Sequence, residues 1–77
     1  MKQKGLNFKM DYLRYGSTGP AIQLLQLALQ RAGYQPGALD GVFGQNTRRA
    51  LLAFQTSNGL RADGVVGPLT NAAIMPW

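Results

Sequence analysis

The sequence predicts an all-α fold: a compact three-helix domain with two copies of one turn motif. The chain has 77 residues, which is enough for one domain only. Three segments carry apolar residues at helical spacing, and each follows a glycine that can begin a helix. The motif Asp-Gly-Val-apolar-Gly-x-x-Thr occurs at residues 40–47 and again at residues 63–70, so the same turn followed by a helix start occurs twice.

Each part of the motif has a local role. Asp-Gly favours a turn, because Asp accepts a hydrogen bond from the backbone two residues on and Gly adopts a positive φ without strain. The next two residues are apolar and plug the core. The second glycine caps a helix, and in the second copy Pro68 takes the first helical position, where no N–H is needed. The threonine lies one turn into the helix, where its hydroxyl can reach back to the turn.

The first helix is expected from Pro20 to Ala32. Its inward stripe follows the spacing i, i+3, i+7, i+10 and consists of Ile22, Leu25, Leu29 and Ala32. Leu24, Leu27 and Ala28 widen the apolar face beyond this stripe. Either the N-terminal segment covers this flank, which we expect, or the flank is an exposed binding surface. We expect Gln26 to hydrogen-bond a neighbouring loop.

The second helix is expected from Gln45 to Asn58 and the third from Pro68 to Met75, ended by Pro76. The inward face of the second consists of Thr47, Ala50, Leu51 and Phe54. Gly33 and Gly59 each precede an apolar residue, which is typical of a Schellman helix ending. Helices this short depend on packing against one another.

Residues 1–12 are interpreted as a basic leader or linker, and residues 13–77 as the domain. We expect a partly ordered tail; the alternative is an arm that packs Phe8, Tyr12 or Leu13 onto the helices. The net charge is +5. Residues 1–14 hold four basic residues against one aspartate, and residues 15–77 hold four against two, so most of the charge lies in the first fourteen residues. Nucleic-acid binders more often concentrate charge on the folded face.

The absent residue types exclude most catalytic chemistry. The sequence has no His, Glu or Cys, which removes the commonest general base, zinc ligands and cysteine nucleophile. Asp40 and Asp63 are interpreted as turn residues, not as catalytic groups or metal ligands. We therefore predict a non-catalytic chain without a cofactor. No apolar run is long enough to span a membrane or to form a signal-peptide core. If the domain works outside the cell, a longer parent protein or another export route must carry it.

The pattern resembles the small helical peptidoglycan-binding domain that is attached to bacterial and phage cell-wall hydrolases. The resemblance covers about residues 13–75 and includes both turn motifs and both Schellman glycines. The other matching residues are Gly16, Gly19, Ile22, Leu25, Gln26, Leu29, Tyr34, Ala50, Phe54, Gln55 and Leu60. Residues 13–16 and 31–37 further resemble modules joined to zinc peptidases of Gram-positive cell walls. Asn71 stands where the family usually has an aromatic residue.

The resemblance implies a module that binds peptidoglycan in the cell wall or outside the cell, as a monomer covalently attached to a hydrolase or peptidase. Stem peptides offer carboxylates and amides, which Arg and Gln donors suit. The expected ligand-binding residues are Tyr34, Gln45, Asn46, Arg48, Arg49 and Gln55. The alternative for Arg48 and Arg49 is a solvated helix face that binds no ligand. Whether the ligand is the glycan or the stem peptide stays open. The rival functions are a nucleic-acid-binding domain and a protein–protein module that uses the Leu24–Leu27 flank.

Overall fold

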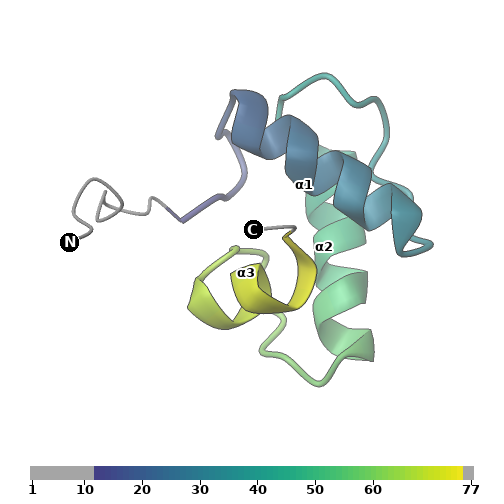
Figure 1. Ribbon diagram of the computed structural model, residues 1–77, viewed down its shortest axis with the longest axis vertical. Coiled ribbons are helices and arrows are strands. Elements are labelled where there is room, and N and C mark those ends of the chain that lie inside the picture. Colours follow the sequence, from purple (N-terminus) through teal and green to yellow (C-terminus); the bar gives the residue numbers. More distant parts are fainter. Residues whose placement is uncertain (1–11, 76–77) are drawn as a thin grey trace, which may run out of the picture.

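The computed structural model describes residues 12–75, which form three helices and no strand within that range. The helices are α1 (Pro20–Arg31), α2 (Gln45–Ser57) and α3 (Pro68–Ile74). Figure 1 shows α1 lying across one end of α2, with α3 beside the other end. The all-α, three-helix prediction is confirmed, and each helix begins where the sequence predicted and ends one residue earlier.

The helix ends follow from glycine. Gly19, Gly44 and Gly67 are the N-caps of the three helices. At the end of α1, the Tyr34 N–H donates to the Leu29 carbonyl at 2.9 Å and the Gly33 N–H donates to Gln30 at 3.0 Å. These two bonds form a Schellman ending, which requires the φ of +98° at Gly33. The end of α2 repeats the pattern, since Leu60 donates to the Gln55 carbonyl at 2.8 Å and Gly59 donates to Thr56 at 3.3 Å.

The core lies between the three helices and receives one plug from each turn motif. Its buried apolar residues are Ile22, Leu25, Leu29, Phe43, Ala50, Leu51, Phe54, Val66 and Met75. The predicted inward faces are confirmed except at Ala32, which is exposed because it lies in the cap that ends α1. The plugs are Phe43 from the first motif and Val66 from the second.

The segment before α1 ties the two turn motifs together. Phe43 exchanges backbone hydrogen bonds with this segment: its carbonyl accepts from Gly16, and its N–H donates to Ser17, both at 2.9 Å. The Val66 N–H donates to the Leu13 carbonyl at 2.8 Å. Residues 13–19 therefore act as a strap across both copies of the motif, although each contact is only an isolated bridge.

Tyr12 and Leu13 pack on the domain, as the arm alternative predicted. Leu13 lies against the core, and the ring of Tyr12 lies over Gly67. The expectations for Phe8 and for an extended segment over residues 6–10 fall outside the described residues. The boundary between residues 12 and 13 stays a prediction.

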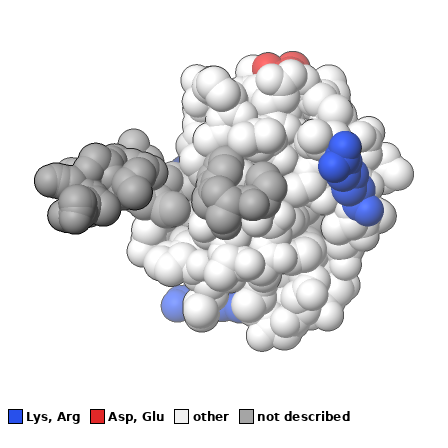
Figure 2. Space-filling view, in the orientation of Figure 1, with Lys and Arg blue, Asp and Glu red and all other residues white. Residues whose placement is uncertain are grey.

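The part of the chain that the structure describes carries few charged side chains. In Figure 2 the charged side chains of the described residues lie toward the edges of the face, and the described residues between them are uncharged. No helix within residues 12–75 combines the length and apolar character needed to cross a membrane.

Candidate functional site

The buried amide of Gln26 holds the first turn motif. Its Nε2 donates to the Val42 carbonyl and to Thr47 Oγ1, both at 3.0 Å, and lies 3.2 Å from Asp40 Oδ1. Its Oε1 accepts the Gly41 N–H at 2.9 Å. The side chain is 1% exposed. The expectation that Gln26 bonds a loop is confirmed, and every polar atom of its amide is used inside the protein.

Gln55 forms the same network with the second motif. Its Nε2 donates to the Val65 carbonyl at 3.0 Å and lies 3.1 Å from Asp63 Oδ1 and 3.2 Å from Thr70 Oγ1. Its Oε1 accepts the Gly64 N–H at 3.0 Å, and the side chain is fully buried. This burial removes Gln55 from the predicted ligand-binding set, because a fully buried amide that already bonds the turn motif cannot be reached by a ligand.

The two motif aspartates close their own turns. Asp40 Oδ1 accepts the Val42 N–H and Asp63 Oδ1 accepts the Val65 N–H, each at 3.0 Å. For Asp40, the Val42 N–H and then the Gln26 amide hold the pKa below its ordinary value of 3.8. For Asp63, the Val65 N–H is the main cause of a lowered pKa. Both carboxylates thus have the structural role that the sequence predicted. No group of three His, Cys, Asp or Glu side chains within residues 12–75 is placed to hold a metal ion.

These lowered pKa values predict the direction of acid unfolding. Because the folded pKa of both groups lies below the unfolded value, their stabilisation is complete above about pH 3.8 and is lost as pH falls through the folded pKa. We expect the melting temperature to be nearly flat from pH 5 to 7 and to decline below pH 4. Circular dichroism melts of wild type and of Asp40→Asn/Asp63→Asn test this. The double variant should show a shallower decline, and an unchanged decline would refute the assignment.

Four of the six predicted ligand-binding residues lie together on the outer surface of α2. Gln45, Asn46, Arg48 and Arg49 are all exposed. Arg49 Nη1 lies 3.5 Å from Asn46 Oδ1, so the contact holds the guanidinium only loosely. The Arg48 side chain lies beside Gly64 of the second turn motif. The two guanidinium groups thus form an open basic surface, the α2 arginine surface, that can donate to carboxylates.

Tyr34 stands apart from this set. It is half-buried after the Schellman glycine, and its ring meets Phe54 edge-on, with ring centroids 5.8 Å apart and an interplanar angle of 87°. Phe54 faces the core, so the ring of Tyr34 serves packing.

Residues 12–75 line at least two grooves on the surface, and sequence reasoning found only part of one. The larger, here called the α1–α3 groove, has a volume of about 380 Å³. Its lining consists of Leu24, Leu27, Ala28, Arg31, Ala32, Phe54, Ala73 and Ile74. The flank of Leu24 and Leu27 is thus one wall of a groove. A smaller groove of about 190 Å³ lies between Tyr12 and the start of α3, where Leu69 is 76% exposed.

Comparison with known proteins gives a consistent result. The sequence model of the peptidoglycan binding domain family matches residues 18–74. Zinc D-Ala-D-Ala carboxypeptidase of Streptomyces albus G is 46% identical over 63 residues, which is 75% of this chain and 24% of that protein. The N-acetylmuramoyl-L-alanine amidase CwlM of Mycobacterium tuberculosis is 41% identical over 61 residues, 77% of this chain and 15% of that protein.

The fold matches solved structures as well. The N-terminal domain of SleB superimposes with a TM-score of 0.81 at 36% identity, covering 86% of this chain and 90% of that one. The chain spans less than a quarter of the two enzymes above, whereas it spans almost all of this isolated domain.

Proposed function

The chain belongs to the peptidoglycan-binding domain family, and on that premise we propose that it is a non-catalytic module that targets an attached hydrolase or peptidase to the bacterial cell wall. The observation that carries this proposal is the family match over residues 18–74, which includes all three helices and both turn motifs. The two described aspartates support a non-catalytic role, since both are engaged in closing turns.

Targeting works through effective concentration. A module that holds its partner domain near the polymer raises the local concentration of substrate without changing the chemistry, and a repeating wall adds avidity to weak single contacts. In this proposal Arg48 and Arg49 bind carboxylates of the wall, supported by Gln45 and Asn46. Both arginines are exposed and neither is neutralised by a carboxylate among the described residues. The module acts at the cell wall or outside the cell.

A pull-down of the purified domain tests the function. Insoluble peptidoglycan sacculi and DNA-cellulose are compared at low and at moderate salt. Retention on sacculi that survives moderate salt is the expected result. Absence of retention on sacculi, together with DNA binding that falls steeply with salt, would replace the proposal by the nucleic-acid function.

Single arginine variants then test the α2 arginine surface. Arg48→Gln and Arg49→Gln should each weaken retention on sacculi by roughly fivefold, because a charge-assisted hydrogen bond becomes a neutral one. Arg14→Gln is the matched control, since it removes the same charge from an exposed position in another segment. Equal retention of all three variants would indicate that Arg48 and Arg49 form a solvated helix face without a role in binding.

A further inference from the structure

The α1–α3 groove is an apolar surface that all three helices build. Leu24, Leu27 and Ala28 come from α1, Phe54 from the last turn of α2, and Ala73 and Ile74 from the end of α3. Leu24 is 39% exposed. No residue from 12 to 75 covers the groove, which leaves an apolar hollow open in the described part of the chain.

The size and shape of the groove suit a short segment of small residues. Its volume of about 380 Å³ lies at the lower end of the range for ligand sites, roughly 300–1,000 Å³. Three of its lining residues are alanines, Ala28, Ala32 and Ala73, of which the last two are exposed. Alanine walls let a ligand backbone approach closely, and they present methyl groups to its side chains.

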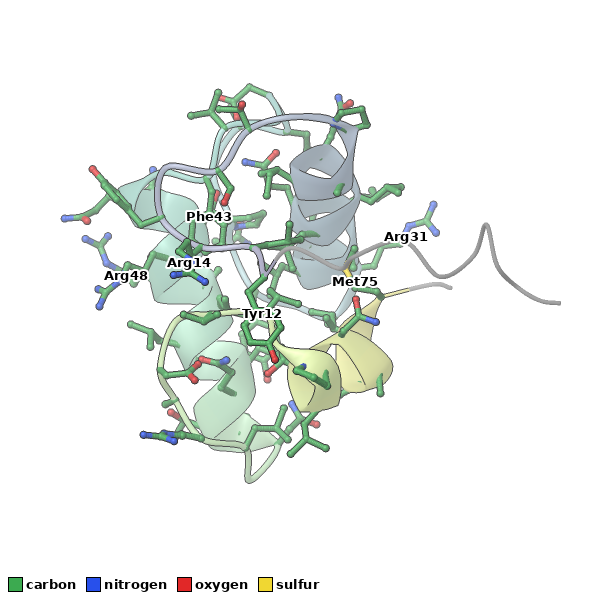
Figure 3. All side chains as sticks on the ribbon, turned by 90° about the vertical axis from the view of Figure 1, so that its left-hand side faces the viewer. Tyr12, Arg14, Arg31, Phe43, Arg48 and Met75 are labelled. Atoms are coloured by element: carbon green, nitrogen blue, oxygen red, sulfur yellow. The ribbon has the colours of Figure 1, made fainter. Side chains whose placement is uncertain are left out.

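One charge marks the end of the groove. Arg31 is the single charged lining residue, and it stands in the last turn of α1. Its guanidinium makes no hydrogen bond or ion pair with any residue from 12 to 75, because Asp40 and Asp63 close the turn motifs. Figure 3 shows Arg31 and Arg48 projecting from opposite sides of the molecule, so this site is separate from the α2 arginine surface. An unpaired guanidinium beside an apolar surface is complementary to a carboxylate on an apolar ligand.

The lining of the α1–α3 groove also argues against a sugar as its ligand. Apart from Arg31, the lining side chains carry no hydrogen-bonding group. A glycan that entered this groove would lose hydrogen bonds to water from its hydroxyl groups without replacement, which is costly. A peptide with methyl side chains and a terminal carboxylate would place its methyl groups against the apolar lining and its carboxylate against Arg31.

We infer that the α1–α3 groove binds the carboxylate end of a short alanine-rich peptide, with Arg31 on the carboxylate and the alanine and leucine side chains on the methyl groups. This inference rests on the proposed function, because such a peptide end occurs in the stem peptide of peptidoglycan. It assigns stem-peptide recognition to a surface distinct from the α2 arginine surface.

An NMR titration of the ¹⁵N-labelled domain tests this inference. The probes are Nα,Nε-diacetyl-L-lysyl-D-alanyl-D-alanine, in which acetylation leaves the lysine uncharged, and the same tripeptide with a C-terminal amide. We expect the acid to shift amide signals of residues 24–32 and 73–74, and the C-terminal amide to bind at least about fivefold more weakly because it lacks the charge. Equal affinity for the two probes, or shifts confined to the first turns of α2, would overturn the inference.

Two matched pairs of variants sharpen the result. Arg31→Gln should reduce affinity for the acid about fivefold and leave the affinity for the amide probe unchanged, whereas Arg14→Gln should change neither. Ala73→Trp should fill the groove and abolish binding, while Ala72→Trp, at an exposed neighbour outside the lining, should not. Circular dichroism confirms that each variant is folded. Binding that survives in Ala73→Trp would exclude the groove as the site.

The sacculi pull-down separates this inference from the proposed function. If wild type is retained on sacculi but the tripeptide acid shifts no groove signal, the groove assignment is wrong and the targeting function stands. If the tripeptide binds in the groove but the domain is not retained on sacculi, the groove assignment stands and the targeting function is wrong. If neither binds, both are wrong.

Discussion

Replacing Gln26 by leucine is expected to lower the free energy of unfolding by about 3 kcal/mol or more, a large share of the stability of a small domain. Leucine matches the size of the side chain but has no polar atoms. The Gly41 N–H loses its buried acceptor, and the Val42 carbonyl and Asp40 carboxylate lose a donor. A buried group left without a partner costs roughly 1–3 kcal/mol, so the loss far exceeds that of one exposed hydrogen bond.

Urea unfolding followed by circular dichroism measures this effect. Gln30→Leu is the matched control: it makes the same chemical change on the same helix at an exposed position, and should alter stability by less than about 0.5 kcal/mol. Gln55→Leu should reproduce the large loss, because its amide makes the equivalent bonds to the second motif. A loss below about 1 kcal/mol in Gln26→Leu would show that water satisfies the turn in place of the amide.

The comparison of Gln26 with Gln55 shows where sequence reasoning succeeded and where it failed. Gln26 was correctly expected to bond a loop, but Gln55 was assigned to the ligand surface. The signal was present, because Gln55 lies one helical turn after Leu51 on the inward face, and Phe54-Gln55 parallels Leu25-Gln26. The equivalence is hard to see in the sequence because the spacing from glutamine to motif aspartate differs. Asp40 follows Gln26 by 14 positions, whereas Asp63 follows Gln55 by 8.

Features with a local cause were predictable. Helix ends depend on glycine and proline at fixed offsets, so the caps at Gly44 and Gly67 and the Schellman endings followed from the sequence. The bonds of the strap were not predictable, because they join backbone groups of Leu13 and Gly16 that carry no side-chain pattern. Pairing between distant backbone segments depends on the assembled fold.

The α1–α3 groove at the surface also could not be predicted in full from the sequence, because it too depends on the assembled fold. The excess of leucine on α1 indicated that something apolar lay outside the core stripe. The contribution of Phe54, Ala73 and Ile74 depends on how α1 and α3 meet, which is a tertiary property. The sequence analysis did not include Arg31 among the expected ligand-binding residues, and only its place in the lining makes it a candidate for binding a ligand.

Phe43→Ala is expected to destabilise the domain by about 3–5 kcal/mol, as aromatic deletions in protein cores do. Phe43 is 1% exposed and is among the largest fully buried side chains in the described residues. Its backbone is fixed by Gly16 and Ser17 of the strap, so the chain cannot move inward to close the cavity. A loss of this size corresponds to a fall in melting temperature of more than about 10 °C for a domain of this length.

The adjacent residue provides the control. Val42 is 49% exposed, so Val42→Ala should change stability by no more than about 0.5 kcal/mol although it lies in the same motif. The second copy of the motif provides a comparison for the stability loss, because Val66 is the equivalent plug. Its replacement by alanine removes a smaller volume from the core. If Phe43→Ala cost no more than Val66→Ala, the first motif would tolerate a cavity, and its rigidity would come from the Gln26 network and the strap alone. The expected order, Phe43→Ala well above Val66→Ala and both above Val42→Ala, would show that each turn motif acts through its buried plug.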